Sequence, residues 1–331
     1  MNSHNNVLYF INMKEVVAGV DIGGTNSVFG LVDSTGDVIA EGSLETTEYP
    51  HIEDFVSALT TSIYKLLAAN KELTLRGIGI GAPNANYHKG TIELAPNLAW
   101  KGIVPLTNLI RAKIDVPVVL TNDANAAAMG EMIFGGAKNM KEFIILTLGT
   151  GLGSGIVVNG EVVYGHTGFA GELGHYTVVA GGRACGCGRN GCLETYASAT
   201  GLVRTVLHML SEMREDSVLR DIPPSELTSR TIAEAASAKD PVALRAMDYT
   251  AEKLAFGITN AIVFSSPEAV FLFGGLAQAG DLLFKPVQKY VDMNVMPIFR
   301  GTVKILPSVV PESNAAVLGS AALAWNKLNK Q

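Results

Sequence analysis

Short apolar segments separated by turn signals open the chain. Residues 16–22, 27–33 and 37–43 are rich in β-branched and other apolar residues, and the segments GGT and STG lie between them. Runs of this length bounded by Gly, Ser and Thr are typical of strands joined by tight turns. The pattern therefore predicts a three-stranded antiparallel meander at the start of the fold.

A helix and two further strands complete this first unit. Apolar residues recur at helical spacing from position 55 to position 67, which predicts an amphipathic helix. Residues 75–81 and 116–120 are short apolar runs, as expected for buried strands of a parallel sheet. The predicted order is a β-β-β-α-β-α-β unit.

The same order starts again at Phe143. The segment ILTLGTGLGSGIVVNGEVV repeats the layout of AGVDIGGTNSVFGLVDSTGDVI, which is strand, glycine loop, strand, tight turn and strand. This indicates an internal duplication. Residues 165–230 interrupt the second copy with loops and short elements. Asp240 and Pro241 then have the spacing of an N-cap and first residue of a long helix that runs toward Ser265.

The remaining elements of the second copy follow in the expected order. We predict strands at residues 269–273 and 303–306, a helix between them, and a last helix at residues 313–328. Two similar α/β halves imply a cleft between them.

Chain length also favours two domains, because a single core usually stops growing below 331 residues. We expect a smaller α/β domain at residues 15–121, completed by the C-terminal helix 313–331. The larger domain is expected at residues 122–312.

Composition narrows the class of protein. Apolar residues make up 48% of the chain and charged residues 17%, as in compact globular proteins. A net charge of −6 without a basic run argues against a nucleic-acid surface, and no apolar stretch approaches the ~18 residues that span a bilayer. The N-terminal segment has no signal-peptide cleavage site. We expect a cytoplasmic protein without nucleic-acid or membrane partners, preceded by a short leader at residues 1–13.

Two glycine-rich loops link strands in the two halves. They span residues 21–25 (DIGGT) and 149–155 (GTGLGSG). Glycine permits positive φ and lets backbone amides approach an anion, so a facing pair of such loops can hold a polyphosphate. A dinucleotide-binding loop opens directly into a helix, and the P-loop pattern GxxxxGK[ST] is absent, so both of those nucleotide sites are disfavoured. As a duplicated pair, the loops favour a nucleotide over plain hairpin turns.

All three cysteines lie close together. Cys185, Cys187 and Cys192 fall within eight residues, and His175 precedes the first of them by ten positions. Three thiolates and one imidazole form a complete tetrahedral zinc set, and four protein ligands leave no coordination position open for substrate. The three cysteines are too close together in sequence for disulfides to stabilise a fold of this size. This fits cysteines that bind a metal as thiolates in a reducing compartment. We therefore expect a structural zinc ion.

Carboxylates and one histidine form a second group of candidate functional residues. Asp123 follows a predicted strand end and precedes an alanine-rich helix, where it could accept a proton from a hydroxyl during phosphoryl transfer. From spacing alone it is equally well explained as the N-cap of that helix. Glu172, His175 and Glu194 frame the cysteine cluster with groups that recognise hydroxyls.

Six motifs together resemble those of the ROK family of sugar kinases: DIGGT, APNLAW, TNDANAAAMGE, TLGTGLGSG, GELGH and CGCGRNGCLE. The resemblance runs from about Val16 to Leu323. It implies the duplicated actin-like, hexokinase-like (RNase H-like) two-domain α/β fold, with an interdomain cleft and a zinc-binding insertion. It also implies transfer of the γ-phosphoryl group of MgATP to the 6-hydroxyl of a hexose, foremost glucose, by a homodimer or homotetramer.

The resemblance assigns roles to matching residues. Asp123 matches the catalytic base, and Asp21 is expected to act on Mg²⁺ through water. The residues expected to contact the hexose are Asn97, Asn122, Asp123, Glu172, His175 and Glu194. Those expected to bind the nucleotide are Asp21, Gly23, Gly24, Thr25, Gly149, Thr150, Gly151, Gly274 and Gly275. The expected zinc ligands are His175, Cys185, Cys187 and Cys192, and His175 is expected to face the sugar with its second ring nitrogen.

One departure from the family pattern concerns Asn84. Many relatives have a proline-glycine pair where this chain has Pro83 and Asn84. Asparagine tolerates the left-handed backbone region, so the turn is expected to survive. Its side chain could also reach the sugar, which would alter substrate choice.

Several alternatives stay open. Within the family, the substrate could be N-acetylmannosamine, N-acetylglucosamine or fructose, and polyphosphate could be the donor. A sugar-responsive transcriptional regulator is disfavoured because Asp21 stands almost at the start, without an expected helix-turn-helix before it. A nucleotide-dependent protein without transferase activity is disfavoured by Asp123 and the full set of sugar-type residues.

Overall fold

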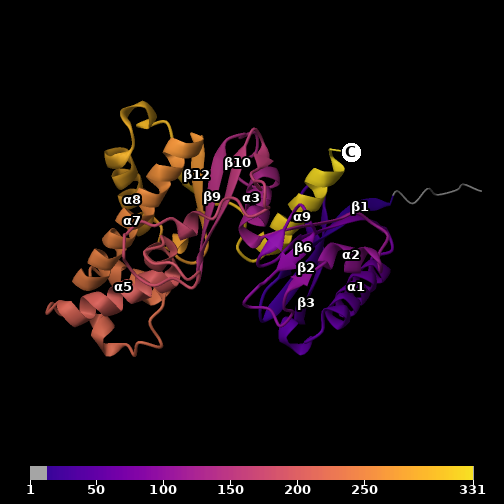
Figure 1. The fold of residues 1–331 in the computed structure, drawn as a ribbon, viewed down its shortest axis with the longest axis horizontal. Coiled ribbons are helices and arrows are strands. Elements are labelled where there is room, and N and C mark those ends of the chain that lie inside the picture. Colours follow the sequence, from indigo (N-terminus) through magenta and orange to yellow (C-terminus); the bar gives the residue numbers. More distant parts are fainter. Residues whose placement is uncertain (1–12, 331) are drawn as a thin grey trace, which may run out of the picture. The chain divides into compact units, whose positions relative to one another are not determined.

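Residues 13–330 are described by the computed structural model, and they form two compact units. Unit 1 comprises the residues up to Asn122 together with those from Ala316, and unit 2 is Asp123–Ala315. Each unit has its own apolar core, and Figure 1 follows the chain through both. Within the described part of the chain, no helix is long and apolar enough to cross a membrane.

Unit 1 is built on a five-stranded sheet with the order β3-β2-β1-β4-β8. Its strands are β1 (Lys14–Ile22), β2 (Asn26–Asp33), β3 (Val38–Glu45), β4 (Leu73–Gly81) and β8 (Val118–Thr121). The first three form the antiparallel meander that the sequence predicts, and β4 and β8 add to β1 in parallel.

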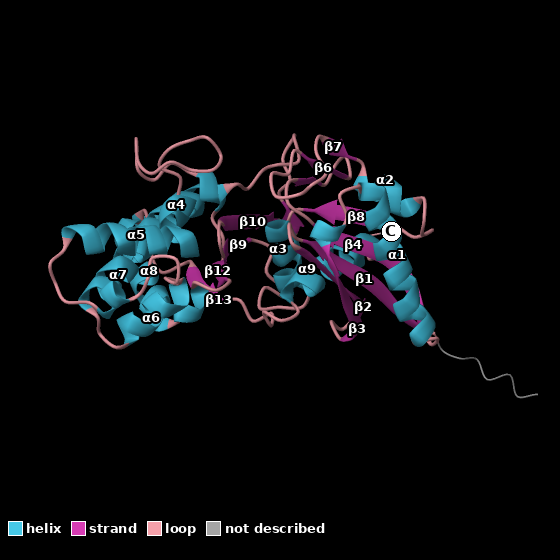
Figure 2. Ribbon diagram, turned by 90° about the horizontal axis from the view of Figure 1, so that it is seen from below, coloured by secondary structure: helices cyan, strands magenta, loops and turns pink. Residues whose placement is uncertain are grey.

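Helices cover both faces of this sheet (Figure 2). Phe55, Leu59 and Ile63 of α1 (Ile52–Ala69) belong to the same buried core as Val20 of β1. The last helix, α9 (Ala315–Leu328), lies so close to the opposite face that a side chain on Gly79 would collide with its backbone. The short helix α2 (Leu106–Arg111) precedes β8, and a 3-10 turn, η1 (Thr46–Glu48), follows β3.

A small second sheet in unit 1 is absent from the sequence-based expectation. Its strands are β5 (Ala85–Asn86), β6 (Thr91–Glu93) and β7 (Ile103–Val104), paired antiparallel in that order. Strands of two or three residues are too short to show a hydrophobic period.

Unit 2 repeats the first sheet with the order β11-β10-β9-β12-β13. Its strands are β9 (Phe143–Leu148), β10 (Leu152–Val158), β11 (Glu161–Val162), β12 (Ala269–Phe273) and β13 (Lys304–Pro307). Again the first three are antiparallel and the last two are parallel to the first. The predicted α/β duplication is therefore confirmed.

Most helices within residues 13–330 belong to unit 2. They are α3 (Asp123–Ile133), α4 (Glu194–Ala197), α5 (Ala199–Glu212), α6 (Ser229–Ser237), α7 (Pro241–Ser265) and α8 (Asp281–Asn294). Short 3-10 turns are η2 (Leu173–His175), η3 (Val218–Asp221), η4 (Ala277–Ala279) and η5 (Pro297–Phe299). The Asp240 carboxylate accepts hydrogen bonds from the amides of Val242 and Ala243 at 3.0 and 2.9 Å, which confirms the predicted N-cap of α7.

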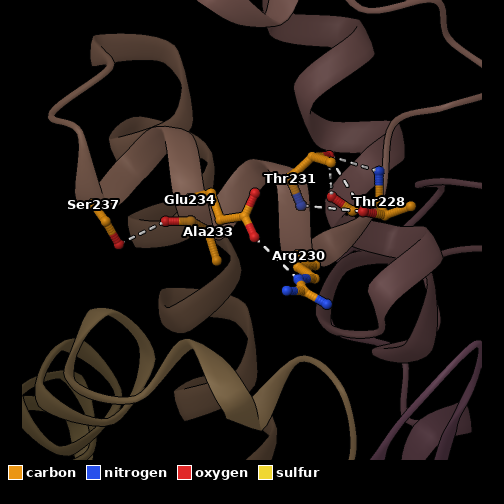
Figure 3. A network of polar contacts seen from close by, with 6 residues as sticks. All are labelled: Thr228, Arg230, Thr231, Ala233, Glu234 and Ser237. Carbon is orange, nitrogen blue, oxygen red and sulfur yellow. Dashed lines mark hydrogen bonds and ion pairs between the residues drawn. The ribbon is translucent and has the colours of Figure 1, made fainter.

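Local contacts define where α6 begins in the segment that interrupts the second copy. Thr228 and Thr231 form a capping box, with the Thr231 amide donating to Thr228 Oγ1 at 3.1 Å and the Thr228 amide donating to Thr231 Oγ1 at 3.0 Å. Arg230 and Glu234 pair one turn apart at 3.0 Å (Figure 3). These contacts satisfy the first amides of a helix that is only nine residues long.

Candidate active site and metal centre

The three cysteines and His175 converge on one point of unit 2. Their candidate ligand atoms all lie within 4.8 Å of one another. Cys187 Sγ is 3.7 Å from Cys192 Sγ, and Cys185 Sγ is 3.6 Å from His175 Nδ1. Tetrahedral zinc with Zn–S bonds of about 2.3 Å places its sulfur ligands about 3.8 Å apart. The three thiols are not joined by disulfides, so the geometry fits a four-ligand zinc site.

Main-chain contacts pre-form the loop that carries this cluster. The Cys185 amide donates to the Arg189 carbonyl at 2.9 Å, and Thr177 pairs with Cys192 as an isolated antiparallel bridge. The Arg189 guanidinium donates to the His175 carbonyl at 3.2 Å and to Thr177 Oγ1 at 3.0 Å. The loop thus closes on η2, which brings His175 to the thiols across ten positions of sequence.

The protonation chemistry of the thiols also fits a cation. Burial, together with the neighbouring thiols of Cys187 and Cys192, raises the pKa of Cys185 to about 12 against an opposing backbone hydrogen bond. Thiolates this close together repel one another unless a positive ion balances their charge. A divalent metal would supply that charge, and a closed four-ligand set would make its role structural.

Glu194 joins the metal centre to the first strands of unit 2. It is the first residue of α4, and its Oε2 accepts a hydrogen bond from the Leu152 amide at 3.0 Å. Its Oε1 lies 3.5 Å from Cys185 Sγ. One carboxylate therefore contacts both the zinc-type cluster and the beginning of β10.

Glu172 lies close to the charged groups of Asp123, His175 and Glu194. Ser154 of β10 donates to the Gly171 carbonyl and accepts from the Leu173 amide at 2.9 Å, which fixes the residues on either side of Glu172. Partial desolvation raises the pKa of Glu172, the carboxylates of Asp123 and Glu194 raise it further, and His175 opposes them. The structure thus brings together four of the six residues expected around the sugar.

Asp123 is the first residue of α3 and is exposed. Its Oδ1 accepts a hydrogen bond from the Ala124 amide at 2.8 Å, so the carboxylate does contact the start of its own helix. Gly153 and Gly155 of β10 let this helix approach closely, because a Cβ on Gly155 would lie 2.8 Å from the Ala124 carbonyl oxygen. Sheet glycines therefore set the position of Asp123.

The second glycine loop lies between β9 and β10, against the start of α5. The Ala199 amide donates to the Gly149 carbonyl at 2.9 Å, and Thr200 Oγ1 donates to the Thr150 carbonyl at 2.7 Å. Gly274 follows β12 with a φ of +98°, and a Cβ there would lie 2.9 Å from the Leu148 carbonyl oxygen. The turn of Gly274 and Gly275 is thus beside the base of this loop.

The first glycine loop, residues 21–25 of unit 1, begins in the last two residues of β1 and leads into β2. The Gly23 amide donates to the Asn26 carbonyl at 3.0 Å and closes the turn. A Cβ on Gly24 would lie 2.7 Å from the Asn97 carbonyl oxygen. The structure therefore brings Asn97 to the loop that contains Asp21, Gly23, Gly24 and Thr25.

Buried anchors hold the segment around Asn97. Asn97 itself is exposed, whereas Leu98 and Trp100 are buried. The Trp100 indole donates to the Tyr49 carbonyl at 2.9 Å and packs on the Phe55 ring with centroids 4.7 Å apart. The polar side chain of Asn97 thus stands on a rigid apolar base.

Asn84 adopts the expected turn, and its side chain has partners within unit 1. Its φ of +50° confirms the left-handed turn. Its side-chain amide, however, donates to the carbonyls of Glu93 and Leu94 at 3.1 and 3.3 Å. The amide thus closes the turn against the end of β6, and contact of this side chain with the sugar stays a prediction.

The expected sugar residues are thus divided between the units. Asn97 and Asn122 belong to unit 1, whereas Asp123, Glu172, His175 and Glu194 belong to unit 2. Sequence reasoning missed Ser154 and Thr200. The Ser154 hydroxyl hydrogen-bonds to the residues on either side of Glu172, and the Thr200 hydroxyl donates to the Thr150 carbonyl. Ser154 carries a weak signal, because it is a polar residue in an otherwise apolar buried strand.

Two equivalent sheets, each with a glycine loop after its first strand, define a duplicated α/β fold. A sequence profile of the ROK family matches residues 17–327, and the chain belongs to that family. A glucokinase of Halalkalibacterium halodurans is 37% identical over 84% of this chain and 86% of that protein. A xylose repressor of Caldicellulosiruptor bescii is 31% identical over 93% of this chain and 77% of that protein.

Among solved structures, the chain is similar to a ROK family glucokinase from Streptomyces griseus in complex with glucose and AMPPNP. The TM-score is 0.77 at 33% identity, over 94% of this chain and 99% of that one.

Proposed function

We propose that this protein is an ATP-dependent hexose kinase that transfers the γ-phosphoryl group of MgATP to the 6-hydroxyl of glucose. Similarity to glucokinases over most of both chains supports this function. The observation that carries the chemistry is the cluster of Asp123, Glu172, His175 and Glu194, which lies in the same unit as a glycine loop. Carboxylates and imidazole recognise hydroxyls, and amides of the loop can hold phosphate.

In this proposal Asp123 is the general base. The 6-hydroxyl oxygen of glucose bonds to the γ-phosphorus, the bond from that phosphorus to the β-γ bridging oxygen breaks, and the hydroxyl proton passes to Asp123. Phosphoryl transfer depends mainly on positioning and charge neutralisation, so one exposed carboxylate near the other polar groups is sufficient. Mg²⁺, when bound, neutralises phosphate charge, and Asp21 at the end of β1 would hold it through water.

Zinc would position His175 rather than react. His175 Nδ1 faces Cys185 Sγ at 3.6 Å, so this nitrogen would be the metal ligand and Nε2 would be left for a sugar hydroxyl. Glu172 and Glu194 would bind further hydroxyls, together with Asn97 and Asn122 of unit 1. Fixing one nitrogen on a metal sets the tautomer and orientation of the other.

The two glycine loops would hold the nucleotide phosphates, and the turn after β12 would contact the adenosine. The residues assigned to the phosphates are Gly23, Gly24, Thr25, Gly149, Thr150 and Gly151, and those assigned to the adenosine are Gly274 and Gly275. Positive φ at Gly274 and the close approach of Gly24 to the Asn97 carbonyl both require glycine, which supports these positions.

We also propose that the functional domains are residues 15–121 with 313–331, and residues 122–312, and that the protein acts in the cytoplasm as a homodimer or homotetramer. Exposed apolar side chains of unit 2 support self-association. They are Phe256, Val263 and Phe264 on α7, with Met296 and Ile298 after α8, and Phe264 is 79% exposed. Apolar groups this exposed are typical of protein interfaces.

A sugar-responsive regulator is the second candidate, favoured by 31% identity to a xylose repressor over 93% of this chain. The test is ADP release by purified, zinc-loaded protein with MgATP and a panel of glucose, mannose, fructose, N-acetylglucosamine and N-acetylmannosamine. We expect glucose to give the highest kcat/KM. A higher kcat/KM for another sugar would change the assigned substrate. Replacing ATP with polyphosphate tests the phosphoryl donor. Sugar binding without turnover by any donor would favour the transcriptional regulator.

A further inference from the structure

The start of α5 holds two successive carbonyl groups of the second glycine loop. The Ala199 amide bonds to the Gly149 carbonyl at 2.9 Å, and Thr200 Oγ1 bonds to the Thr150 carbonyl at 2.7 Å. The first contact is made by the backbone and survives any substitution except proline. The second depends on one exposed hydroxyl, that of Thr200.

Peptide geometry gives these contacts a consequence for the opposite side of the loop. In a trans peptide group the C=O and the N–H that follows it point in opposite directions. Fixing the carbonyls of Gly149 and Thr150 on α5 therefore turns the amides of Thr150 and Gly151 away from α5. Neither of these amides donates to an acceptor within residues 13–330. Two adjacent amides with the same direction form a nest for an anion.

Thr200 is itself held in place by neighbouring groups. Ser198 Oγ lies 3.0 Å from Thr200 Oγ1, donates to the Glu194 carbonyl at 2.7 Å and accepts from the Gly201 amide at 3.0 Å. Arg183 donates to the Gly201 carbonyl at 3.1 Å. The hydroxyl therefore extends from a rigid helix start.

We propose that Thr200 is a positioning residue for the nucleotide, and that its hydroxyl orients the amides of Thr150 and Gly151 toward the ATP phosphates. The inference rests on the proposed kinase function. Glu194 holds the Leu152 amide at the other end of the loop at 3.0 Å. Residues 194–200 thus brace the loop at both ends and connect it with the metal centre.

The test compares Thr200→Val, which keeps the shape and removes the hydroxyl, with Thr200→Ser, which keeps the hydroxyl. Ser211→Ala on the same helix is the matched control, because its hydroxyl bonds only to a carbonyl of its own helix. Calorimetry measures binding of Mg-AMPPNP and of glucose, steady-state kinetics give kcat and both KM values, and metal analysis gives the zinc content.

We expect Thr200→Val to weaken AMPPNP binding and raise the KM for ATP by about 5- to 20-fold, the range for one lost orienting hydrogen bond. Glucose affinity, zinc content and melting temperature should match the wild type. Thr200→Ser should recover most of the nucleotide affinity, and Ser211→Ala should behave as wild type.

Three results would overturn the inference. These are unchanged AMPPNP affinity in Thr200→Val, equal weakness of Thr200→Ser, or a parallel loss of zinc and glucose binding that marks a general structural role. If the wild type phosphorylates glucose and Thr200→Val binds AMPPNP as tightly as the wild type, the inference about Thr200 is rejected and the kinase function stands. If the wild type binds AMPPNP and Thr200→Val binds it more weakly, but no sugar is phosphorylated, only the proposed kinase function is rejected. Failure of wild type to bind AMPPNP would reject both.

Discussion

The two units share a sheet order and a glycine loop after the first strand, but they brace that loop by different means. In unit 1 the loop rests on backbone, with Gly24 against the Asn97 carbonyl. In unit 2 one backbone contact, from the Ala199 amide to the Gly149 carbonyl, is joined by two side-chain contacts, from Glu194 to the Leu152 amide and from Thr200 to the Thr150 carbonyl. A backbone brace tolerates changes of side chain, whereas a side-chain brace can be altered one residue at a time. Unit 2 is therefore where sequence variation can adjust the site.

The largest effect expected comes from Asp123, the proposed general base in unit 2. Asp123→Ala, and the isosteric Asp123→Asn, should lower kcat by about 10²- to 10⁴-fold, because the general base is lost. Glucose affinity by calorimetry should change little. A variant that keeps more than a tenth of wild-type kcat would show that Asp123 only caps α3.

Breaking the metal centre tests whether unit 2 alone depends on a bound ion. Cys187→Ser removes an exposed ligand of the cluster, so the protein should lose zinc and about 2–4 kcal/mol of stability, within the range of severe single substitutions. Glucose affinity should fall with it, because His175 loses its fixed orientation. Metal analysis, thermal unfolding and glucose titration measure the three effects.

Chelator-treated wild type is the control for that variant, and it should reproduce the same losses. A zinc-free protein with full stability and full glucose affinity would contradict the metal assignment.

Paired glycine substitutions sharpen the difference between the two braces. A Cβ at Gly24 would press on the Asn97 carbonyl oxygen at 2.7 Å, which is backbone. A Cβ at Gly151 would collide with the end of the Glu194 side chain, which can rotate away. Gly24→Ala should therefore reduce kcat/KM for ATP by about tenfold or more, and Gly151→Ala by less.

Steady-state kinetics of the two alanine variants provide the comparison. The reverse order of effects would mean that the first loop is the more adaptable of the two.

The smallest effect concerns the β-hairpin turns after the glycine loops. In unit 2, Asn159 and Gly160 form a two-residue turn with positive φ. In unit 1, buried Asp33 instead accepts hydrogen bonds from the amides of Thr35 and Asp37 at 2.9 and 3.0 Å and pairs with Lys14 at 2.6 Å. Burial opposes ionisation of Asp33, but these contacts outweigh it and hold its pKa well below the usual range.

A depressed pKa makes the Asp33 contribution dependent on pH. Since the folded pKa lies below the unfolded value of about 3.9, the stabilisation is present above pH ~4 and is lost as the pH falls below it. Asp33→Asn should cost about 1–2 kcal/mol at pH 7, with the difference from wild type shrinking toward pH 3. Urea unfolding at both pH values measures it, and a difference independent of pH would contradict the role of the charge.

Both main sheets could be predicted from the sequence because their strands are apolar runs bounded by glycine loops and tight turns. The strands β1 and β9 stand out for this reason, and the Asp240-Pro241 pair marked the start of α7. The small sheet β5-β6-β7 escaped prediction because its strands of two or three residues have no period.

The motifs could locate the metal ligands, since Cys185, Cys187 and Cys192 are close in sequence. The motifs could not identify the side-chain contacts that hold the second glycine loop. Thr200 meets Thr150 across 50 positions, and Glu194 meets Leu152 across 42, so only the folded chain brings them together. Asn84 shows the converse, because its backbone conformation followed from residue type and its side-chain partners did not.

The packing of α9 has a consequence for synthesis on the ribosome. The backbone of this helix lies so close to Gly79 that a side chain there would collide with it. Ser320 Oγ accepts a hydrogen bond from the Gly81 amide at 3.1 Å. Unit 1 therefore needs a segment that is translated almost 200 residues after its own sheet. Unit 2 is continuous in sequence and can fold as it emerges, so the first half to be synthesised is the last half to be completed.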